Sequence, residues 1–498
     1  MSRTTRMLGM WWPPALASGI TALLWLFGAG KELWYSERFV QVIGALSWRE
    51  MFSLLKFENN PPLWFIVARA WQSIAGASET HARLLTLFIT MCFFAVLWWC
   101  TRAMTDTQAA RRTVLLASVA GFVVLQSVEY RMYSLVMLCS TIALFCAWQY
   151  SQRPDRRYLI GLVATSVLGF HMHYTYAIVI AFTWAWVFLT QRTRWRAGII
   201  GVGATIAGMA PWFMISLWPI LSDLGSNLSV QQRSAPWWSL VLLPFHTYVP
   251  RVFQEALWLF ILRVAVSAAV LACIVRALRS ADMQRRKCAW YLVLFVACCI
   301  VFSSVLRLTL DKYAAAAVPA VLMLVGIGIG IPRLRRAFRV TMMMVVIAGS
   351  VIVSFQLVRT PNSTYRAAAE IVEQGEQAGD RLIVVPFNDD IAVRPYYRGS
   401  LAVTGFFPAK DPGTVTLQDN IRNNFKSVVT ADTIGRLEEY VGDAQGVWLF
   451  YDIPMSPGFW NGHLIDAWFK RNGFVSVVYR SVFRNVPPLL VHYSRTLP

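Results

Sequence analysis

The chain has 498 residues, of which 57% are hydrophobic and 14% are charged. Soluble proteins carry about 25% charged residues, so this composition excludes an ordinary soluble globular protein. The net charge of +20 would suit a nucleic-acid partner. Its distribution argues against one, because the basic residues recur in short segments between long apolar runs. No nucleic-acid partner is expected.

The basic segments indicate how a membrane protein is oriented. Each contains two to five Lys or Arg residues, and only Asp106, Asp155 and Asp282 oppose them. Cytoplasmic loops of membrane proteins carry such a positive excess. The segments expected in the cytoplasm are 1–10, 102–112, 151–157, 191–196, 276–287 and 332–339.

The apolar runs between these segments predict about eleven transmembrane helices. Ala15-Leu16-Ala17 resembles a signal cleavage site but precedes the apolar stretch, so the first run is expected to remain as a span. An odd number of spans with a cytoplasmic N-terminus places the C-terminus outside. The expected spans are 11–30, 82–103, 112–126, 134–150, 158–170, 176–191, 197–219, 255–276, 288–306, 314–331 and 340–358.

The predicted membrane domain covers residues 1–358 and includes a long first outer loop, 31–81. Within this loop, residues 61–71 suit an amphipathic helix at the membrane interface, and the loop 220–254 is also expected to be interfacial. The eight cysteines lie in or beside spans and have neither disulfide nor metal-site spacing.

From about residue 359 the composition changes. A helix is expected over 364–377 and another over 464–472, and strands are expected over 380–386, 446–451 and 474–479. Helices that alternate with strands predict a small α/β domain over 359–498. The fold expected for the whole chain is a multi-span α-helical membrane protein with a soluble C-terminal α/β domain.

Placing ionisable residues near the outer ends of spans costs free energy, so such residues commonly have a functional role. Each has a structural alternative: carboxylates pair with arginines, histidines lie at the interface without a ligand, and a lysine reaches the lipid headgroups. Their gathering on one predicted face favours a functional site. The groups are Glu37 with Arg38, Glu58, Glu129 with Arg131 and Tyr133, His171 with His173, and Lys312 with Tyr313.

Several short motifs follow one another along the chain. They are Leu33–Phe39, Asn60-Pro61-Pro62-Leu63-Trp64, Ser78-Glu79 with Arg83, Glu129-Tyr130-Arg131-Met132-Tyr133, His173-Tyr174, Lys312-Tyr313 ahead of Pro319, Tyr365–Ala368 and Gly379-Asp380. In this order they resemble the motifs of the dolichyl-phosphate-mannose-protein mannosyltransferase-like family of bacterial membrane proteins. Each motif is weak alone, but the order and spacing are specific, and the likeness covers about residues 11–400.

This resemblance implies a GT-C-type glycosyltransferase fold with its active site on the outer face. The implied reaction moves a sugar from a polyprenyl phosphate to an acceptor hydroxyl, with inversion if the displacement is direct. The chain departs from the family at one position, because the usual Asp-Glu pair of the first outer loop is Ser36-Glu37 here. Serine is no base near neutral pH, so either Glu37 or Glu58 replaces the aspartate, or the chemistry differs, or the protein is inactive.

The resemblance also implies roles for the polar residues. Glu37 is the expected catalytic base, and Glu129 is expected to orient donor or acceptor. Arg131 and Lys312 are expected to stabilise the leaving phosphate. The remaining expected substrate-binding residues are Glu58, Tyr133, His173 and Tyr313.

The sequence assigns no cofactor, and a divalent metal is an open alternative. Glu58 with His171 or His173 would supply its ligands, and a related aminoarabinose transferase family has an acidic residue near a comparable Phe-Glu-x-Pro position. Three residues from separate loops are not by themselves a metal-site pattern.

Other functions stay open. An O-antigen-type polymerase or ligase is expected to place its large outer loop late, and a transporter is expected to show inverted repeats; neither pattern is present in the sequence. A catalytically inactive binding protein is the alternative that Ser36 favours. The expected partners are a polyprenyl-phosphate-linked sugar, a glycan, lipid or protein acceptor, and the bilayer of a bacterial inner membrane.

Overall fold

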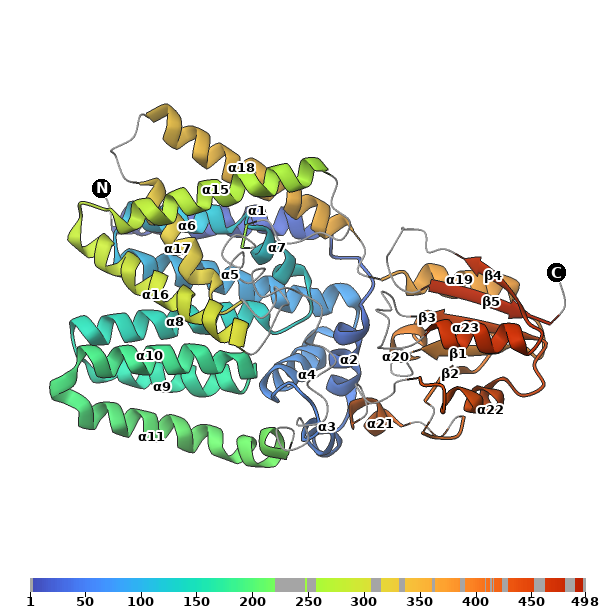
Figure 1. The fold of residues 1–498 in the computed structure, drawn as a ribbon. Helices are drawn as coiled ribbons and strands as arrows, with labels where there is room; N and C mark the ends of the chain where they lie inside the picture. Colours follow the sequence, from blue (N-terminus) through green and yellow to red (C-terminus); the bar gives the residue numbers. More distant parts are fainter. Residues whose placement is uncertain are drawn as a thin grey trace. The chain divides into compact units, whose positions relative to one another are not determined.

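The computed structural model describes residues 3–219, 247–248, 257–305, 315–330, 336–360, 363–385, 390–407, 409–412, 414, 416–422, 429–451, 462–479 and 489–495. These residues form two compact units (Figure 1). The first, here the helical unit, contains residues up to Gly30, from Asn60 to Leu217, and those described between 247 and 360. The second, here the sheet unit, contains residues 31–59, 218–219 and those described after 360.

In the helical unit a helix, or a pair of helices, lies at each of the eleven positions where an apolar run predicts a span. An additional helix, α4, lies at the start of the unit's second segment. The helices are α1 (Arg3–Leu26), α4 (Leu63–Ala75), α5 (Glu79–Met104), α6 (Thr107–Ala117), α7 (Gly121–Val128), α8 (Tyr133–Gln152), α9 (Arg156–Phe170), α10 (Ala177–Thr190), α11 (Trp195–Trp212), α15 (Leu257–Leu278), α16 (Met283–Val305), α17 (Val318–Ile329) and α18 (Arg336–Arg359).

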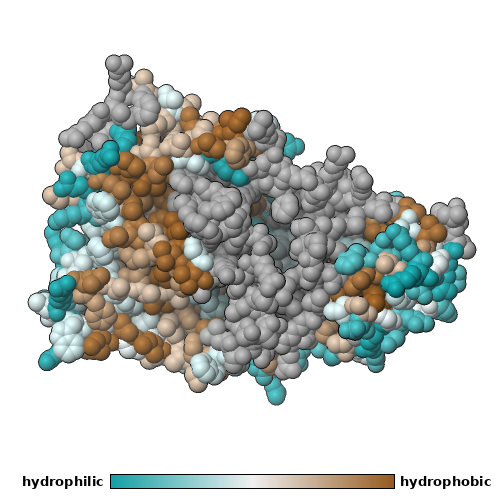
Figure 2. All heavy atoms as spheres, viewed as in Figure 1, coloured by the Kyte–Doolittle hydropathy of each residue, from teal (hydrophilic) through white to brown (hydrophobic). Residues whose placement is uncertain are grey.

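Six helices in the described part of the chain are long and apolar enough to cross a membrane, and the bent pair α6–α7 would make a seventh. Many large apolar side chains of the unit are exposed, as expected where lipid replaces water. Figure 2 shows such hydrophobic residues as brown patches over the helices. They include Phe88, Leu189, Ile200, Ile206, Trp290, Val301 and Met344. A multi-span membrane protein is therefore confirmed, and the number of eleven spans stays a prediction.

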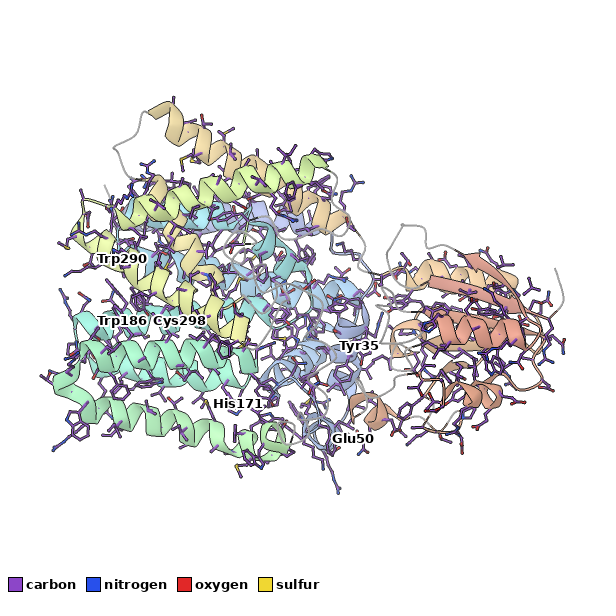
Figure 3. All side chains as sticks on the ribbon, in the orientation of Figure 1. Tyr35, Glu50, His171, Trp186, Trp290 and Cys298 are labelled. Atoms are coloured by element: carbon purple, nitrogen blue, oxygen red, sulfur yellow. The ribbon has the colours of Figure 1, made fainter. Side chains whose placement is uncertain are left out.

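Helix α17 is the buried centre of the helical unit. Each of its residues from Val318 to Ile329 is buried, and it packs against α15, α6 and α16. Glycine permits this close approach: a Cβ added at Gly328 would lie 2.0 Å from the carbonyl oxygen of Cys273 on α15. A second packing centre joins α8, α10 and α16, where Tyr291 contacts Trp148 (ring centroids 5.3 Å apart) and Trp186 (4.7 Å). Trp186 is labelled in Figure 3.

The run predicted as one span over 112–126 is broken in the structure. Helices α6 and α7 meet at a bend of 58°, and the residues at the break use distant partners for their backbone groups. Thr21 donates to the carbonyl of Ser118 (3.0 Å), and Ser354 donates to that of Val119 (2.9 Å). At the start of α7, the amide of Gly121 donates to the carbonyl of Tyr248 (3.0 Å). Non-helical backbone at membrane depth persists only with such partners.

The sheet unit combines a five-stranded sheet with helices from both ends of the chain. The strand order is β2-β1-β3-β5-β4, with β1 parallel to β2 and β3, and β5 antiparallel to β3 and β4. The elements are α2 (Tyr35–Ala45), α3 (Trp48–Leu55), α19 (Tyr365–Gly375), β1 (Arg381–Val385), α20 (Asp390–Val393), β2 (Val403–Gly405), α21 (Leu417–Arg422), α22 (Leu437–Val441), β3 (Gly446–Tyr451), α23 (Gly462–Arg471), β4 (Val475–Tyr479) and β5 (Leu489–Ser494).

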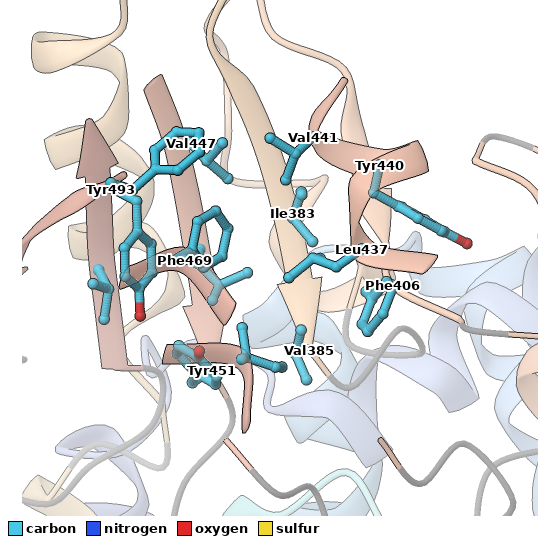
Figure 4. Close-up of a cluster of buried hydrophobic side chains, with 14 of the residues drawn as sticks. Ile383, Val385, Phe406, Leu437, Tyr440, Val441, Val447, Tyr451, Phe469 and Tyr493 are labelled. Carbon is cyan, nitrogen blue, oxygen red and sulfur yellow. The ribbon is translucent and has the colours of Figure 1, made fainter. Parts of the chain in front are cut away.

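Successive residues of the central strands enter two different cores, because side chains alternate across a sheet. In β1, Ile383 and Val385 join the core under α22 and α23 (Figure 4). Leu382 and Val384 join the opposite core, under α19 and α20. The sheet is thus covered on both faces, which explains why its central strands are apolar throughout. The strands predicted over 380–386, 446–451 and 474–479 are present as β1, β3 and β4.

His492 on β5 gives the sheet unit a predicted dependence on pH. It is paired with Trp448 on β3, with ring centroids 4.1 Å apart, and the indole of Trp448 donates to Asp380 at 3.0 Å. Burial lowers the pKa of His492 below its ordinary 6.5, although the carboxylate of Asp380 opposes this shift. The unfolded chain therefore binds a proton more readily than the folded one.

We expect the sheet unit to be most stable at pH values above 6.5, the pKa of His492 in the unfolded chain. It should lose stability as the pH falls through this value, because the unfolded chain then binds the proton first. Pulse proteolysis in urea, on the full chain in detergent at about pH 7.5 and about pH 5.5, would measure this loss. His492→Gln should flatten the dependence. The matched control is His463→Gln, at an exposed position on α23. An equal pH dependence in the wild type and His492→Gln would contradict the assignment.

Candidate functional site

The Glu129–Arg131 turn directly follows the broken half-span α7. The end of α7 is held by two residues of α5: Arg83 donates through Nε to the carbonyl of Val128 (2.8 Å), and Thr86 donates to that of Ser127 (2.9 Å). Both donors are buried. A cation at a helix C-terminus also interacts favourably with the helix dipole. Helix α5 therefore fixes the point from which the turn departs.

Within the turn, Glu129 is half-buried and Arg131 is buried. The amide of Arg131 donates to the carbonyl of Glu129 (2.7 Å), and Gln126 on α7 donates to the Glu129 carboxylate (3.3 Å). A carboxylate and a guanidinium are thus held two residues apart at the end of a short helix. A carboxylate and a guanidinium on one turn can together bind a polar or anionic ligand, so this turn is our candidate for a binding site in the helical unit.

Tyr130, between these two residues, joins the turn to α4. Its ring contacts Trp64 edge-on with centroids 5.7 Å apart, and its hydroxyl accepts a hydrogen bond from Gln72 at 3.2 Å. Trp64, Phe65 and Ala68 of α4 are buried. A helix is therefore present where an interfacial helix is expected over 61–71, and one side of it packs against protein. Its place at the membrane interface stays a prediction.

His173 and Tyr133 lie together, with ring centroids 5.7 Å apart. The backbone amide of Thr175 donates to His173 Nδ1 at 3.2 Å, so this nitrogen carries a lone pair and a neutral His173 has its proton on Nε2. His171 has the opposite arrangement, because its Nδ1 lies 2.8 Å from the carbonyl of Val167, which only accepts. His171 ends α9 (Figure 3), and its carbonyl accepts from the amide of Leu63 at 2.9 Å.

The tautomers matter for the metal alternative. A neutral His173 presents an N–H donor, which suits an anionic or hydroxyl oxygen better than a cation. Among the residues that the structure describes, no three His, Cys, Asp or Glu side chains are grouped to hold a metal ion. A metal bound by Glu58 with His171 or His173 stays a prediction.

Arg83 belongs to a family motif, but the sequence predicts no role for it. Arg83→Met should lower the free energy of unfolding by about 2 kcal/mol, because the buried carbonyl of Val128 loses a charged donor. Thermal unfolding in detergent would measure this. Arg102→Met is the matched control, since Arg102 lies on the same helix and is exposed. Equal stability of Arg83→Met and the wild type would contradict the capping role.

Glu37 lies in the sheet unit, in the first turn of α2. Its carboxylate Oε2 accepts a hydrogen bond from the backbone amide of Trp34 (3.2 Å), and the residue is fully buried. Accepting an amide at the start of a helix is a usual structural role for glutamate at this position. A completely buried carboxylate is uncommon on structural grounds alone. The hydrogen bond fits a structural role of Glu37 at the helix start, whereas its complete burial also fits a functional role.

Glu58, after α3, is also in the sheet unit and is buried. The sequence-predicted residues are thus divided: Glu129, Arg131, Tyr133, His171 and His173 belong to the helical unit, and Glu37 and Glu58 belong to the sheet unit. The late motif, Lys312 and Tyr313, lies outside the described residues, as does most of the loop predicted over 220–254.

The fold of this chain is similar to that of solved structures of ArnT and of an oligosaccharyltransferase. ArnT from Cupriavidus metallidurans matches in its apo state with a TM-score of 0.62 and 15% identity, over 99% of this chain and 98% of that one. Its structure bound to undecaprenyl phosphate matches with a TM-score of 0.59 and 14% identity, over 96% and 97%. The archaeal oligosaccharyltransferase AglB from Archaeoglobus fulgidus, in complex with an inhibitory peptide and a dolichol-phosphate, matches with a TM-score of 0.52 and 12% identity, over 100% and 75%.

The fold and the motifs agree on the class of protein. At these identities the likeness shows the fold, and the predicted GT-C-type membrane fold is confirmed. Residues 59–218 match the model of the dolichyl-phosphate-mannose-protein mannosyltransferase family. The resemblance drawn from the motifs is therefore confirmed as well. No curated protein matches the sequence.

Proposed function

We propose that this protein is a glycosyltransferase that uses a polyprenyl-phosphate-linked sugar and transfers the sugar to an acceptor hydroxyl. The observation that carries the proposal is the Glu129–Arg131 turn, held at the end of a broken span inside a GT-C-type fold. Two of the structural relatives hold a polyprenyl phosphate, undecaprenyl phosphate in one and dolichol-phosphate in the other. This chemistry is transferred to the present chain as part of the proposal.

In the reaction, the acceptor oxygen attacks the anomeric carbon as the bond from that carbon to the phosphate oxygen breaks. Glu37 takes the proton of the acceptor hydroxyl. The leaving group is a phosphate, so it needs cationic stabilisation rather than a strong acid, and Arg131 and Lys312 provide it. Direct displacement inverts the anomeric centre.

The other polar residues hold substrate. The Nε2 proton of a neutral His173 suits a sugar hydroxyl or a phosphate oxygen, and Tyr133 supports its ring. Glu129 orients donor or acceptor, and Glu58 and Tyr313 complete the binding residues. The acceptor is a hydroxyl of a glycan, a lipid or a protein.

The topology belongs to the same proposal. The N-terminus lies in the cytoplasm of a bacterial cell. Because the eleven spans within 1–358 are an odd number, the α/β domain, 359–498, lies on the outside of the inner membrane. A lipid-linked donor fits this side, because nucleotide sugars are cytoplasmic. The basic segments support this orientation through the positive excess of cytoplasmic loops.

The experiment is a transfer assay with purified protein in nanodiscs, a panel of polyprenyl-phosphate sugars, and extracted glycans, lipids and proteins as acceptors. Release of polyprenyl phosphate coupled to a mass increase of an acceptor is the expected result. Mass spectrometry of outer-surface glycans and lipids from cells with and without the protein identifies the natural acceptor. Absence of release with every donor would overturn the proposal.

A further inference from the structure

Tyr396, which follows α20, contacts both sides of the segment that bears Glu37. Its hydroxyl accepts hydrogen bonds from the backbone amide of Leu33 (3.1 Å) and from the guanidinium of Arg38 (2.8 Å). The Cζ of Arg38 also lies over the tyrosine ring, 5.1 Å from its centroid. Leu33 precedes α2 and Arg38 lies in its first turn, directly after Glu37, so a single side chain from the C-terminal part of the chain contacts residues on both sides of Glu37.

A second connection lies directly before this segment. Oε2 of Glu32 accepts from the backbone amide of Arg366 (3.2 Å) and from the hydroxyl of Ser363 (3.4 Å). Arg366 is in the first turn of α19, where a carboxylate interacts favourably with the helix dipole. Its guanidinium lies over the ring of Tyr396 as well, 5.3 Å from the centroid. Glu32 and Tyr396 thus attach the segment to α19 and α20 together.

The third connection is hydrophobic. Tyr35, the first residue of α2, packs against the core formed by α19, α20 and one face of the sheet (labelled in Figure 3). An isolated helix of 11 residues is marginally stable in water, so α2 depends on such contacts for its position. Its first turn is fixed by residues more than three hundred positions later in the chain.

We propose that Tyr396 is a positioning residue for Glu37, through which the C-terminal α/β domain sets the place of the base. This inference rests on the proposed function. Tyr396 takes no part in the chemistry; it holds Leu33 and Arg38, and Glu37 lies between them. A displacement of a reacting group by about 1 Å costs about 10²-fold in rate, so loosening this turn should slow transfer without weakening donor binding.

The test compares Tyr396→Phe with Tyr440→Phe in the full chain. The first variant keeps the ring and removes the hydroxyl that binds Leu33 and Arg38. The second removes a hydroxyl of the same unit that donates to the carbonyls of Phe407 (3.0 Å) and Lys410 (2.9 Å), in the core on the other sheet face. We expect kcat to fall about tenfold or more in Tyr396→Phe, with KM for the donor unchanged. Tyr440→Phe should leave both constants unchanged.

Hydrogen exchange supplies a readout that does not need turnover. Amides of residues 33–45 should exchange faster in Tyr396→Phe and unchanged in Tyr440→Phe. Arg38→Gln removes the guanidinium's hydrogen bond to Tyr396 from the α2 side and leaves the bond from Leu33. It should change kcat and exchange in the same direction, so it tests the inference if Tyr396→Phe does not fold. Wild-type kcat together with wild-type exchange over 33–45 would overturn the inference. Absence of transfer by the wild type itself would overturn the proposed function, while the exchange data would still test the contact.

Discussion

Glu37→Gln is expected to lower the transfer rate by about 10²- to 10⁴-fold, the usual contribution of a general base. The amide oxygen of glutamine can still accept the hydrogen bond that the Trp34 amide donates to Glu37. The helix start should therefore be kept while the basicity is lost. Glu37→Ala removes both, and should add about 1 kcal/mol of lost stability. The measurements are turnover with the active donor and thermal unfolding in detergent.

Glu50→Gln is the matched control for this prediction. Glu50 occupies the same position in α3 that Glu37 occupies in α2, and its carboxylate accepts from the Ser47 amide at 3.0 Å. It is exposed, whereas Glu37 is fully buried. If Glu37 acts only as a helix cap, the two glutamine variants should behave alike. Wild-type turnover by Glu37→Gln would show that Glu37 is not the catalytic base, and Glu58 would be the next residue to test.

The sequence predicted the elements that local pattern determines. Long apolar runs with basic flanks predicted helix positions, because the bilayer requires that composition wherever a span crosses it. Strands β1 and β3 were predicted because each is a short apolar run after a turn. Strand β2 has only three residues, Val403–Gly405, and β5 follows Pro487-Pro488, so neither had a clear local pattern.

The features that the sequence did not predict depend on distant contacts. The bend between α6 and α7 lies inside a continuous apolar run, and its backbone groups are satisfied by Thr21 and Ser354. Similarly, Tyr396 lies 358 residues after Arg38, and no local pattern connects them. The candidate site residues were selected because ionisable residues gather at the ends of apolar runs and match the family motifs, and their roles stay predictions. Arg83 is likewise a charged residue at the start of an apolar run, so the same pattern could have predicted a role for it.

Arg131→Gln is expected to lower kcat/KM for the donor by about 10²-fold, because a donor of charged hydrogen bonds to the leaving phosphate is lost. Arg131→Lys keeps the charge but loses the bidentate geometry, so its loss should be smaller. The acceptor's KM should not change in either variant. Arg153→Gln is the matched control, because Arg153 is exposed and lies at the opposite end of α8. It should leave kcat/KM for the donor unchanged.

A binding comparison separates phosphate recognition from a general loss of structure. In the wild type, polyprenyl phosphate should inhibit transfer far better than the uncharged polyprenol of the same length, because the proposed role of Arg131 is to bind the phosphate. In Arg131→Gln this preference should shrink, whereas inhibition by polyprenol, which carries no phosphate, should stay the same. An undiminished preference for the phosphate in a stably folded Arg131→Gln protein would remove Arg131 from the phosphate site and leave Lys312 as the residue to test.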